Sequence, residues 1–245
     1  MPVDSPPPLE RYDAVLREAG IDAIRYRSYL ERLFSGVPLR GRRVLDVGGG
    51  SGFISFWVAM QGGQTTCLEP SADGSNPHMS ASFRRLAAAL ADLEVTLDPR
   101  SFQAVGPQDA HDVVLVHNAV NHLDEKACVA LPDDEDARRT YARIFGELRA
   151  ITRPGGHLLV ADCSRRNIFG DLRVRNPFVP DIEWHLHHQP SLWRAFAADA
   201  GFVDPEIRWN AMTRTGRVGE ILLSNALGAY VTQSHFTLRM RSPVA

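Results

Sequence analysis

The segment Arg43-Val-Leu-Asp-Val-Gly-Gly-Gly-Ser-Gly-Phe53 decides the fold of this chain. Three apolar residues flank the single acidic residue Asp46, a pattern that predicts a buried strand. The glycine run follows at once, and an apolar stretch then continues to Met60 as a predicted helix. Glycines let a turn adopt positive φ and approach a ligand closely, and a helix start offers unpaired N–H groups. The segment therefore predicts a strand, a ligand-binding turn and a helix.

Further apolar strands alternate with amphipathic helices along the rest of the chain. Apolar runs predict strands at residues 65–69, 94–97, 112–117, 157–162, 206–209 and 235–240. Helical spacing predicts two helices within residues 9–35, and others at 78–93, 134–152 and 191–200. This alternation indicates an α/β fold with a doubly wound, mostly parallel seven-stranded sheet and helices on both faces.

The expected domain organisation is a cap followed by one larger domain. We expect residues 1–38 to form an N-terminal helical cap or lid and residues 39–245 to form the main domain; simple packing of these helices against it is the alternative. Residues 163–190 show no clear periodicity but hold several aromatic residues and arginines. A loop of this length is usually functional or disordered, and its aromatics disfavour disorder. We expect this segment to cover the substrate.

Composition excludes several classes of partner. The 245 residues include 27 basic and 29 acidic ones, so the formal net charge of −2 disfavours nucleic acid as a partner. The three cysteines (67, 128 and 163) stand far apart and suit neither a disulfide framework nor a CxxC metal site. We find no signal peptide pattern and no run of roughly 18 apolar residues. We expect a cytoplasmic monomer or homodimer without metal or membrane partners.

The glycine turn differs from the dinucleotide fingerprint GxGxxG, because Phe53 occupies the place of the third glycine. The segment Asp46-Val-Gly-Gly-Gly-Ser-Gly52 instead closely resembles the first motif of the class I S-adenosylmethionine (SAM)-dependent methyltransferases, (acidic)-x-G-x-G-x-G. Three later features also match that family in the right order. They are Glu69 at the end of the second strand, Asp112 leading into the fourth, and the turn Arg153-Pro-Gly-Gly156 before the fifth.

The resemblance implies a Rossmann-like methyltransferase fold with an antiparallel last strand, and SAM as cofactor. Glu69 would hold the ribose hydroxyls, since a carboxylate can accept two hydroxyl hydrogen bonds. The family often has Cys or Ala at the position of Gly49. We expect the glycine here to reduce only the rigidity of the turn. The cofactor-binding residues implied are Asp46, Gly48, Gly49, Gly50, Gly52, Glu69, Pro70, Ser101, Phe102, His117 and Asn118. Ser101 and Phe102 are expected near the adenine, and His117 and Asn118 near the methionine part.

Histidines after the fourth and fifth strands are the candidates for acceptor chemistry, because ligands of open α/β sheets lie at the carboxyl ends of strands. We expect His122 and His188 to be catalytic, and Trp184 and His185 to bind substrate. On an extended segment His185 and His187 would share one side, with His188 opposite. Three imidazoles could also bind a metal, but we predict no metal site. The loop Asn118-Ala-Val-Asn121 lacks the [DN]PP[YFW] motif of methyltransferases that act on DNA amino groups.

The sequence thus predicts a SAM-dependent methyltransferase of EC 2.1.1 type that acts on an oxygen, nitrogen or carbon nucleophile of a small-molecule metabolite. In-line displacement needs mainly alignment of the reacting atoms. Two alternatives stay open. One is an NAD-type Rossmann oxidoreductase, which Phe53 and Asp46 disfavour. The other is a non-catalytic SAM-fold partner subunit, which the intact glycine turn and Glu69 disfavour.

Overall fold

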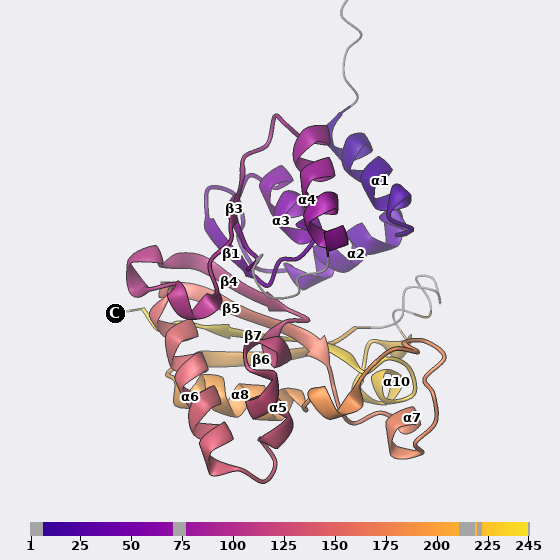
Figure 1. The fold of residues 1–245 in the computed structure, drawn as a ribbon, viewed down its shortest axis with the longest axis vertical. Coiled ribbons are helices and arrows are strands. Elements are labelled where there is room, and N and C mark those ends of the chain that lie inside the picture. Colours follow the sequence, from indigo (N-terminus) through magenta and orange to yellow (C-terminus); the bar gives the residue numbers. More distant parts are fainter. Residues whose placement is uncertain (1–6, 71–76, 211–218, 220–221, 245) are drawn as a thin grey trace, which may run out of the picture. The chain divides into compact units, whose positions relative to one another are not determined.

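The computed structural model describes residues 7–70, 77–210, 219 and 222–244. The chain divides into two compact units, residues 1–104 and residues 105–245. Its seven strands form a mixed sheet in the order β3-β2-β1-β4-β5-β7-β6. Figure 1 draws the strands of each unit as arrows. The predicted seven-stranded α/β sheet with an antiparallel last strand is therefore confirmed.

The first unit is built on three parallel strands, β1 (Arg43–Val47), β2 (Gln64–Leu68) and β3 (Val95–Asp98), with β2 in the middle. Its helices are α1 (Pro8–Glu18), α2 (Ala23–Leu33), α3 (Phe53–Met60) and α4 (Pro77–Ala89), and a 3-10 turn, η1, spans Phe102–Ala104. Helix α3 packs against all three strands. Its side chains are almost all buried, which explains why its sequence is apolar on every face.

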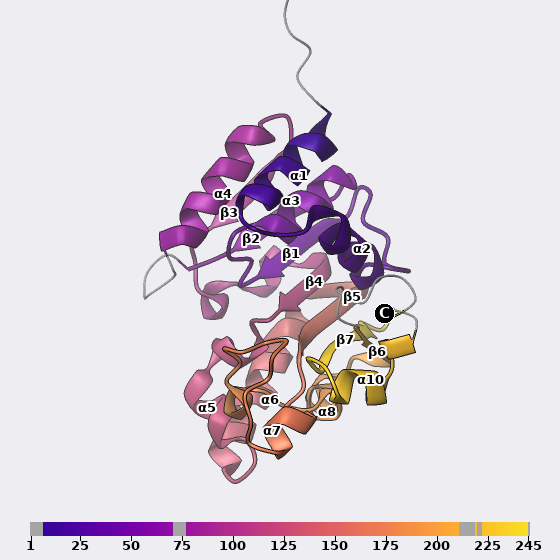
Figure 2. The ribbon, with the colours of Figure 1, turned by 90° about the vertical axis from the view of Figure 1, so that its right-hand side faces the viewer.

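The N-terminal helices are packed into the first unit. Helix α1 contacts α2, α3 and α4, and Figure 2 shows it beside α4. The fully buried Tyr12 donates its hydroxyl to the Phe53 carbonyl oxygen at 2.8 Å. Arg11 donates to the Ala89 carbonyl oxygen at 2.6 Å and pairs with Asp92. These contacts hold α1 against the start of α3 and the end of α4.

The second unit begins with η2 (Pro107–Asp109), β4 (His111–His117), η3 (Val120–Leu123), α5 (Glu125–Ala130) and α6 (Glu135–Ala150). It continues with β5 (Thr152–Cys163), α7 (Ile168–Asp171), η4 (Trp184–Leu186), α8 (Pro190–Asp199), β6 (Val203–Trp209), α10 (Ala226–Tyr230) and β7 (His235–Arg241). Strand β4 is parallel to β5, whereas β7 is antiparallel to both β5 and β6.

Aromatic side chains between α6 and α8 form a cluster in the core of the second unit. The rings of Tyr141 and Trp193 lie 5.2 Å apart, and those of Phe145 and Phe196 stack at 5.8 Å. The Tyr141 hydroxyl donates to the Val120 carbonyl oxygen at 2.9 Å. This bond ties the loop after β4 to the core, so that loop is held in place.

Two expectations about local structure were wrong, and one helix was not predicted. Arg153-Pro-Gly-Gly156 is an irregular part of β5 and not a turn before it. In the pairing of β4 with β5, His111 lies opposite Thr152 and Val113 lies opposite His157. One residue of β4, Asp112, therefore faces these four residues of β5. Thr152 belongs to this strand and not to the preceding helix. Helix α5 was missed; the Asp124 side chain caps it by accepting from the Ala127 N–H at 2.9 Å.

Part of the segment between residues 210 and 234, for which no element was predicted, lies outside the described residues, and α10 lies in the described part. No helix among the described residues combines the length and apolar character needed to cross a membrane.

Candidate functional site: a glycine turn and a strand-end cavity

The glycine turn of the first unit follows β1 as expected. Gly48, Gly50 and Gly52 have φ of 68°, 52° and 77°, a region that side-chain-bearing residues rarely adopt. The N–H groups of Gly48 and Gly49 donate to the Leu68 carbonyl oxygen at 2.8 and 3.3 Å. The turn is therefore fixed to the end of β2, and its shape requires glycine at three positions.

Glu69 lies against this turn. The Gly50 N–H donates to Glu69 Oε2 at 2.9 Å, and the Glu69 N–H donates to the Asp98 carbonyl oxygen at 2.9 Å. The side chain and the following Pro70 are half-buried. The structure thus places the carboxylate from the end of β2 directly on the glycine backbone.

Asp46 lies in the interior of the first unit, 2% exposed. Its Oδ2 accepts the Ser55 hydroxyl at 2.7 Å, so it joins β1 to the first turn of α3. Burial raises its pKa to about 6; the Ser55 hydrogen bond opposes this rise and the nearby negative charge of Glu69 adds to it. Two carboxyl groups therefore concentrate negative potential around the turn.

Gly49 is required by packing, which corrects the expectation that it costs rigidity only. A Cβ at this position would lie 2.6 Å from Cys67 Sγ and 2.9 Å from Asp46 Oδ2. Because Cys67 is fully buried on β2, its sulfur fills the space that a side chain at 49 would need. A similar contact holds at Gly52, where a Cβ would meet the Phe83 ring at 2.5 Å.

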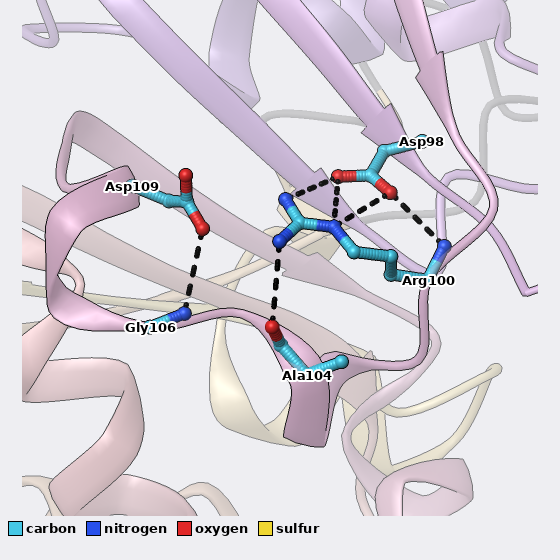
Figure 3. Close-up of polar contacts among 5 residues, drawn as sticks. All are labelled: Asp98, Arg100, Ala104, Gly106 and Asp109. Carbon is cyan, nitrogen blue, oxygen red and sulfur yellow. Dashed lines mark hydrogen bonds and ion pairs between the residues drawn. The ribbon is translucent and has the colours of Figure 1, made fainter.

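The segment after β3 carries an ion pair that the sequence analysis overlooked (Figure 3). Arg100 donates to both carboxylate oxygens of Asp98, at 2.7 to 3.1 Å, and to the Ala104 carbonyl oxygen at 3.4 Å. The Arg100 hydrogen bonds lower the pKa of Asp98. Of the two residues predicted near adenine, Ser101 is exposed and Phe102 is buried.

In the second unit, the loop after β4 begins with a strained residue. Asn118 has φ of 49°, and its N–H donates to the Ala161 carbonyl oxygen at 2.7 Å. The His117 ring lies 5.9 Å from the His235 ring, and burial lowers the pKa of His117 to about 4. His117 is therefore neutral at physiological pH.

A cavity of about 480 Å³ opens beside this loop, a size typical of small-molecule sites. Its apolar wall consists of Phe178, Val179, Pro180, Ile182 and Leu186. Polar or charged groups come from Asn118, Asn121, His122, Asp181, Glu183 and His187. The predicted substrate-covering segment thus supplies much of its lining.

The predicted acceptor residues are dispersed. His122 lines the cavity but is 52% exposed, with its Nδ1 2.6 Å from Glu125 Oε1. His188 is buried, donates Nε2–H to the Cys128 carbonyl oxygen at 2.7 Å, and lines a different cavity. His185 is exposed, and Trp184 packs against Gly170. His122 is the member of this set that the structure brings to the cavity.

A histidine–aspartate pair at the same cavity was missed. His187 Nδ1 lies 3.1 Å from Asp162 Oδ1, and their side chains are 13% and 1% exposed. Asp162 is the next-to-last residue of β5. A carboxylate at the carboxyl end of a central strand was the sequence signal that could have found it.

Among the described residues, no group of three or more His, Cys, Asp and Glu side chains could hold a metal ion. The three neighbouring histidines do not converge, because His187 and His188 line different cavities.

Comparison with known proteins gives matches at the level of structure. No protein-family model and no curated protein sequence matches the chain. A SAM-dependent methyltransferase from Thermotoga maritima, titled a possible histamine N-methyltransferase, is 16% identical, with a TM-score of 0.55 over 95% of this chain and 93% of that one. A SAM-dependent methyltransferase from Archaeoglobus fulgidus is 14% identical, with a TM-score of 0.58 over 94% of this chain and 99% of that one.

A third matched structure, the [4+2]-cyclase SpnF, is 19% identical, with a TM-score of 0.58 over 91% of this chain and 82% of that one. Two other matched chains are longer, and this chain spans 66% and 58% of their lengths. At these identities the likeness shows the fold, which is that of class I SAM-dependent methyltransferases. The cyclase illustrates that one fold hosts different reactions.

Proposed function

We propose that this protein is a SAM-dependent methyltransferase that moves a methyl group to an oxygen, nitrogen or carbon nucleophile of a small-molecule metabolite. The observation that carries the proposal is the Gly50 N–H bonded to the Glu69 carboxylate within a turn of positive-φ glycines. Such a turn leaves the backbone open to a ligand, and the carboxylate suits the ribose hydroxyls of SAM.

The charges around the turn favour SAM over a dinucleotide. Asp46 and Glu69 place two carboxyl groups there, and Glu69 already accepts from the Gly50 amide. A carboxylate in the place of Glu69 suits the ribose of either cofactor, but Asp46 beneath the turn would repel a pyrophosphate, whereas SAM carries a sulfonium and an ammonium that negative potential attracts. These contacts support the methyltransferase proposal against the NAD-type alternative.

SAM supplies an electrophilic methyl group on a sulfonium that is already an activated leaving group. The chain's contribution is to hold the partners in alignment and exclude water. We propose that the first unit binds the cofactor through Gly48, Gly50, Gly52 and Glu69, and that the 480 Å³ cavity of the second unit takes the acceptor. The remaining predicted site residues, a cytoplasmic location and a monomeric or dimeric state stay predictions.

Thermal denaturation with added ligands tests this proposal. A ligand present at 100 times its Kd stabilises by about 2.7 kcal/mol, which for a chain of this size raises Tm by roughly 5–10 °C. We expect SAM and S-adenosylhomocysteine to give such a shift, and NADH to give none. A shift with NADH alone would favour the oxidoreductase. No shift with any of the three at millimolar concentration would favour a non-catalytic partner subunit.

A further inference from the structure

We propose that His187, positioned by Asp162, is the general base for an acceptor that carries a hydroxyl group, in the cavity of about 480 Å³ of the second unit. The inference rests on the proposed methyl transfer and names its acceptor class: a small molecule with an apolar face, whose hydroxyl is methylated and which carries a second hydrogen-bond donor.

The first step in the argument is the orientation of the imidazole. His187 Nδ1 lies 3.1 Å from Asp162 Oδ1. Because an ionised carboxylate can only accept hydrogen bonds, the proton of the neutral His187 ring must be on Nδ1. Asp162 Oδ1 also accepts the Cys163 N–H at 2.8 Å, which fixes the carboxyl group. The Nε2 lone pair of His187 is then available to a ligand in the cavity, and Asp162 stabilises the imidazolium that forms.

The second step is an unsatisfied acceptor at the same cavity. Asn121 is 2% exposed and lines the cavity, yet its Oδ1 has no hydrogen-bond partner among the described residues. A buried amide oxygen without a partner costs about 1–3 kcal/mol. The oxygen is closed to solvent, but the residue lines the cavity, so a rotation of the amide would let a donor on the ligand satisfy it; for this reason we infer a second donor on the acceptor.

The third step compares the other titratable groups at the cavity. Burial raises the pKa of the Cys163 thiol well above its usual range, so it stays protonated. His122 is mostly solvent-exposed and paired with Glu125. Asp181 and Glu183, both exposed, are the remaining charged groups in the lining. His187 is therefore the base that is both sheltered and oriented.

The chemical step balances with these groups alone. The acceptor hydroxyl gives its proton to His187 Nε2 as its oxygen lone pair forms a bond to the methyl carbon. The bond between that carbon and the sulfonium sulfur breaks, and its electron pair stays on sulfur. The products are the methyl ether, S-adenosylhomocysteine and a protonated imidazole that releases its proton to water.

Nuclear magnetic resonance of ¹⁵N-histidine-labelled protein tests the orientation without substrate or SAM. We expect the neutral ring of His187 to carry its proton on Nδ1, with its signals assigned by their loss in His187→Asn. Asp162→Ala should abolish the preference for this tautomer, whereas the exposed control Asp199→Asn should leave it unchanged. A neutral ring with its proton on Nε2 would overturn the proposal.

Binding of defined probes tests the acceptor class in the same SAM-free protein. The probes are 2-naphthol and the 2,3- and 2,7-dihydroxynaphthalenes, each compared with its methyl ether. We expect at least one hydroxyl probe to bind tenfold or more tightly than its ether. We expect this preference to disappear in His187→Asn, which keeps a donor near Asp162 but has no basic nitrogen, and to persist in Asp199→Asn.

Equal binding of every pair, or a preference that survives in His187→Asn and vanishes in His122→Asn, would overturn the assignment. With SAM added, His187→Asn should lower kcat for a bound hydroxyl probe by about 10²–10⁴-fold and leave the KM for SAM unchanged. Failure of SAM to bind would refute the methyltransferase proposal while leaving the tautomer and probe results intact, so the two failures are distinguishable.

Discussion

Gly49→Ala tests the packing under the glycine turn. The added Cβ would lie 2.6 Å from Cys67 Sγ, closer than real side-chain contacts, and 2.9 Å from Asp46 Oδ2. Overpacking of this kind costs about 1–3 kcal/mol. At roughly 2–4 °C per kcal/mol for a chain of this size, we expect Tm to fall by roughly 2–12 °C.

A double mutant isolates the contact that causes this loss. Cys67→Ala removes the sulfur, so the methyl group of Ala at 49 can occupy the space it leaves. We expect Gly49→Ala/Cys67→Ala to be more stable than the sum of the single changes predicts, with a coupling of about 1–2 kcal/mol.

Chemical denaturation of the wild type and the three variants measures this coupling. The control is Gly146→Ala on α6, where a Cβ would meet no atom within 4 Å. It should stabilise the helix by about 0.5–1 kcal/mol. Strictly additive effects, or a Gly49→Ala variant as stable as the wild type, would refute the packing argument.

Three further changes address the turn and its supports. Gly50→Val places a β-branched residue at φ of 52°, so SAM binding should be lost while the far-ultraviolet circular dichroism spectrum stays native; unchanged SAM affinity would contradict the site. For Asp46, whose pKa rises from 3.8 to about 6 on folding, the folded state binds more protons between these values, so stability falls as pH rises through this window. Between pH 3 and pH 7 the free energy of unfolding of the wild type, measured by urea denaturation, should fall by about 3 kcal/mol relative to that of Asp46→Asn. The same pH dependence in both proteins would refute this. Tyr12→Phe removes the hydrogen bond to Phe53 and should cost about 0.5–1.5 kcal/mol, whereas no loss would indicate that α1 is not anchored there.

The strands and long helices were predictable because their apolar patterns are long and regular. Two local features were not. Helix α5 is only six residues long, and the main indication of it in the sequence is the capping residue Asp124. An aspartate at such a place is equally typical of a loop. Arg153-Pro-Gly-Gly156 has the composition of a turn, but the Gly155 N–H donates to the Ser242 carbonyl oxygen at 3.0 Å, and the Ser242 N–H donates to Gly156 at 2.9 Å. These long-range bonds keep the segment within β5.

The site could be predicted where a sequence motif determines the backbone. It could not be predicted where the direction of a side chain depends on the tertiary fold. Glu69 meets the glycine turn because parallel strands end at one edge. His187 was overlooked in favour of His188, since both stand in one histidine-rich segment. A 3-10 turn at Trp184–Leu186 sets their directions, and the buried partner Asp162 lies 25 residues earlier.

The central claim is that the turn and Glu69 bind SAM, and isothermal titration calorimetry of S-adenosylhomocysteine tests it most directly. We expect one binding site per chain in the wild type. Glu69→Ala should bind at least 100-fold more weakly while retaining a native circular dichroism spectrum, because the ribose hydroxyls lose their acceptor. Wild-type protein that binds no S-adenosylhomocysteine, or a Glu69→Ala variant with wild-type affinity, would contradict the account.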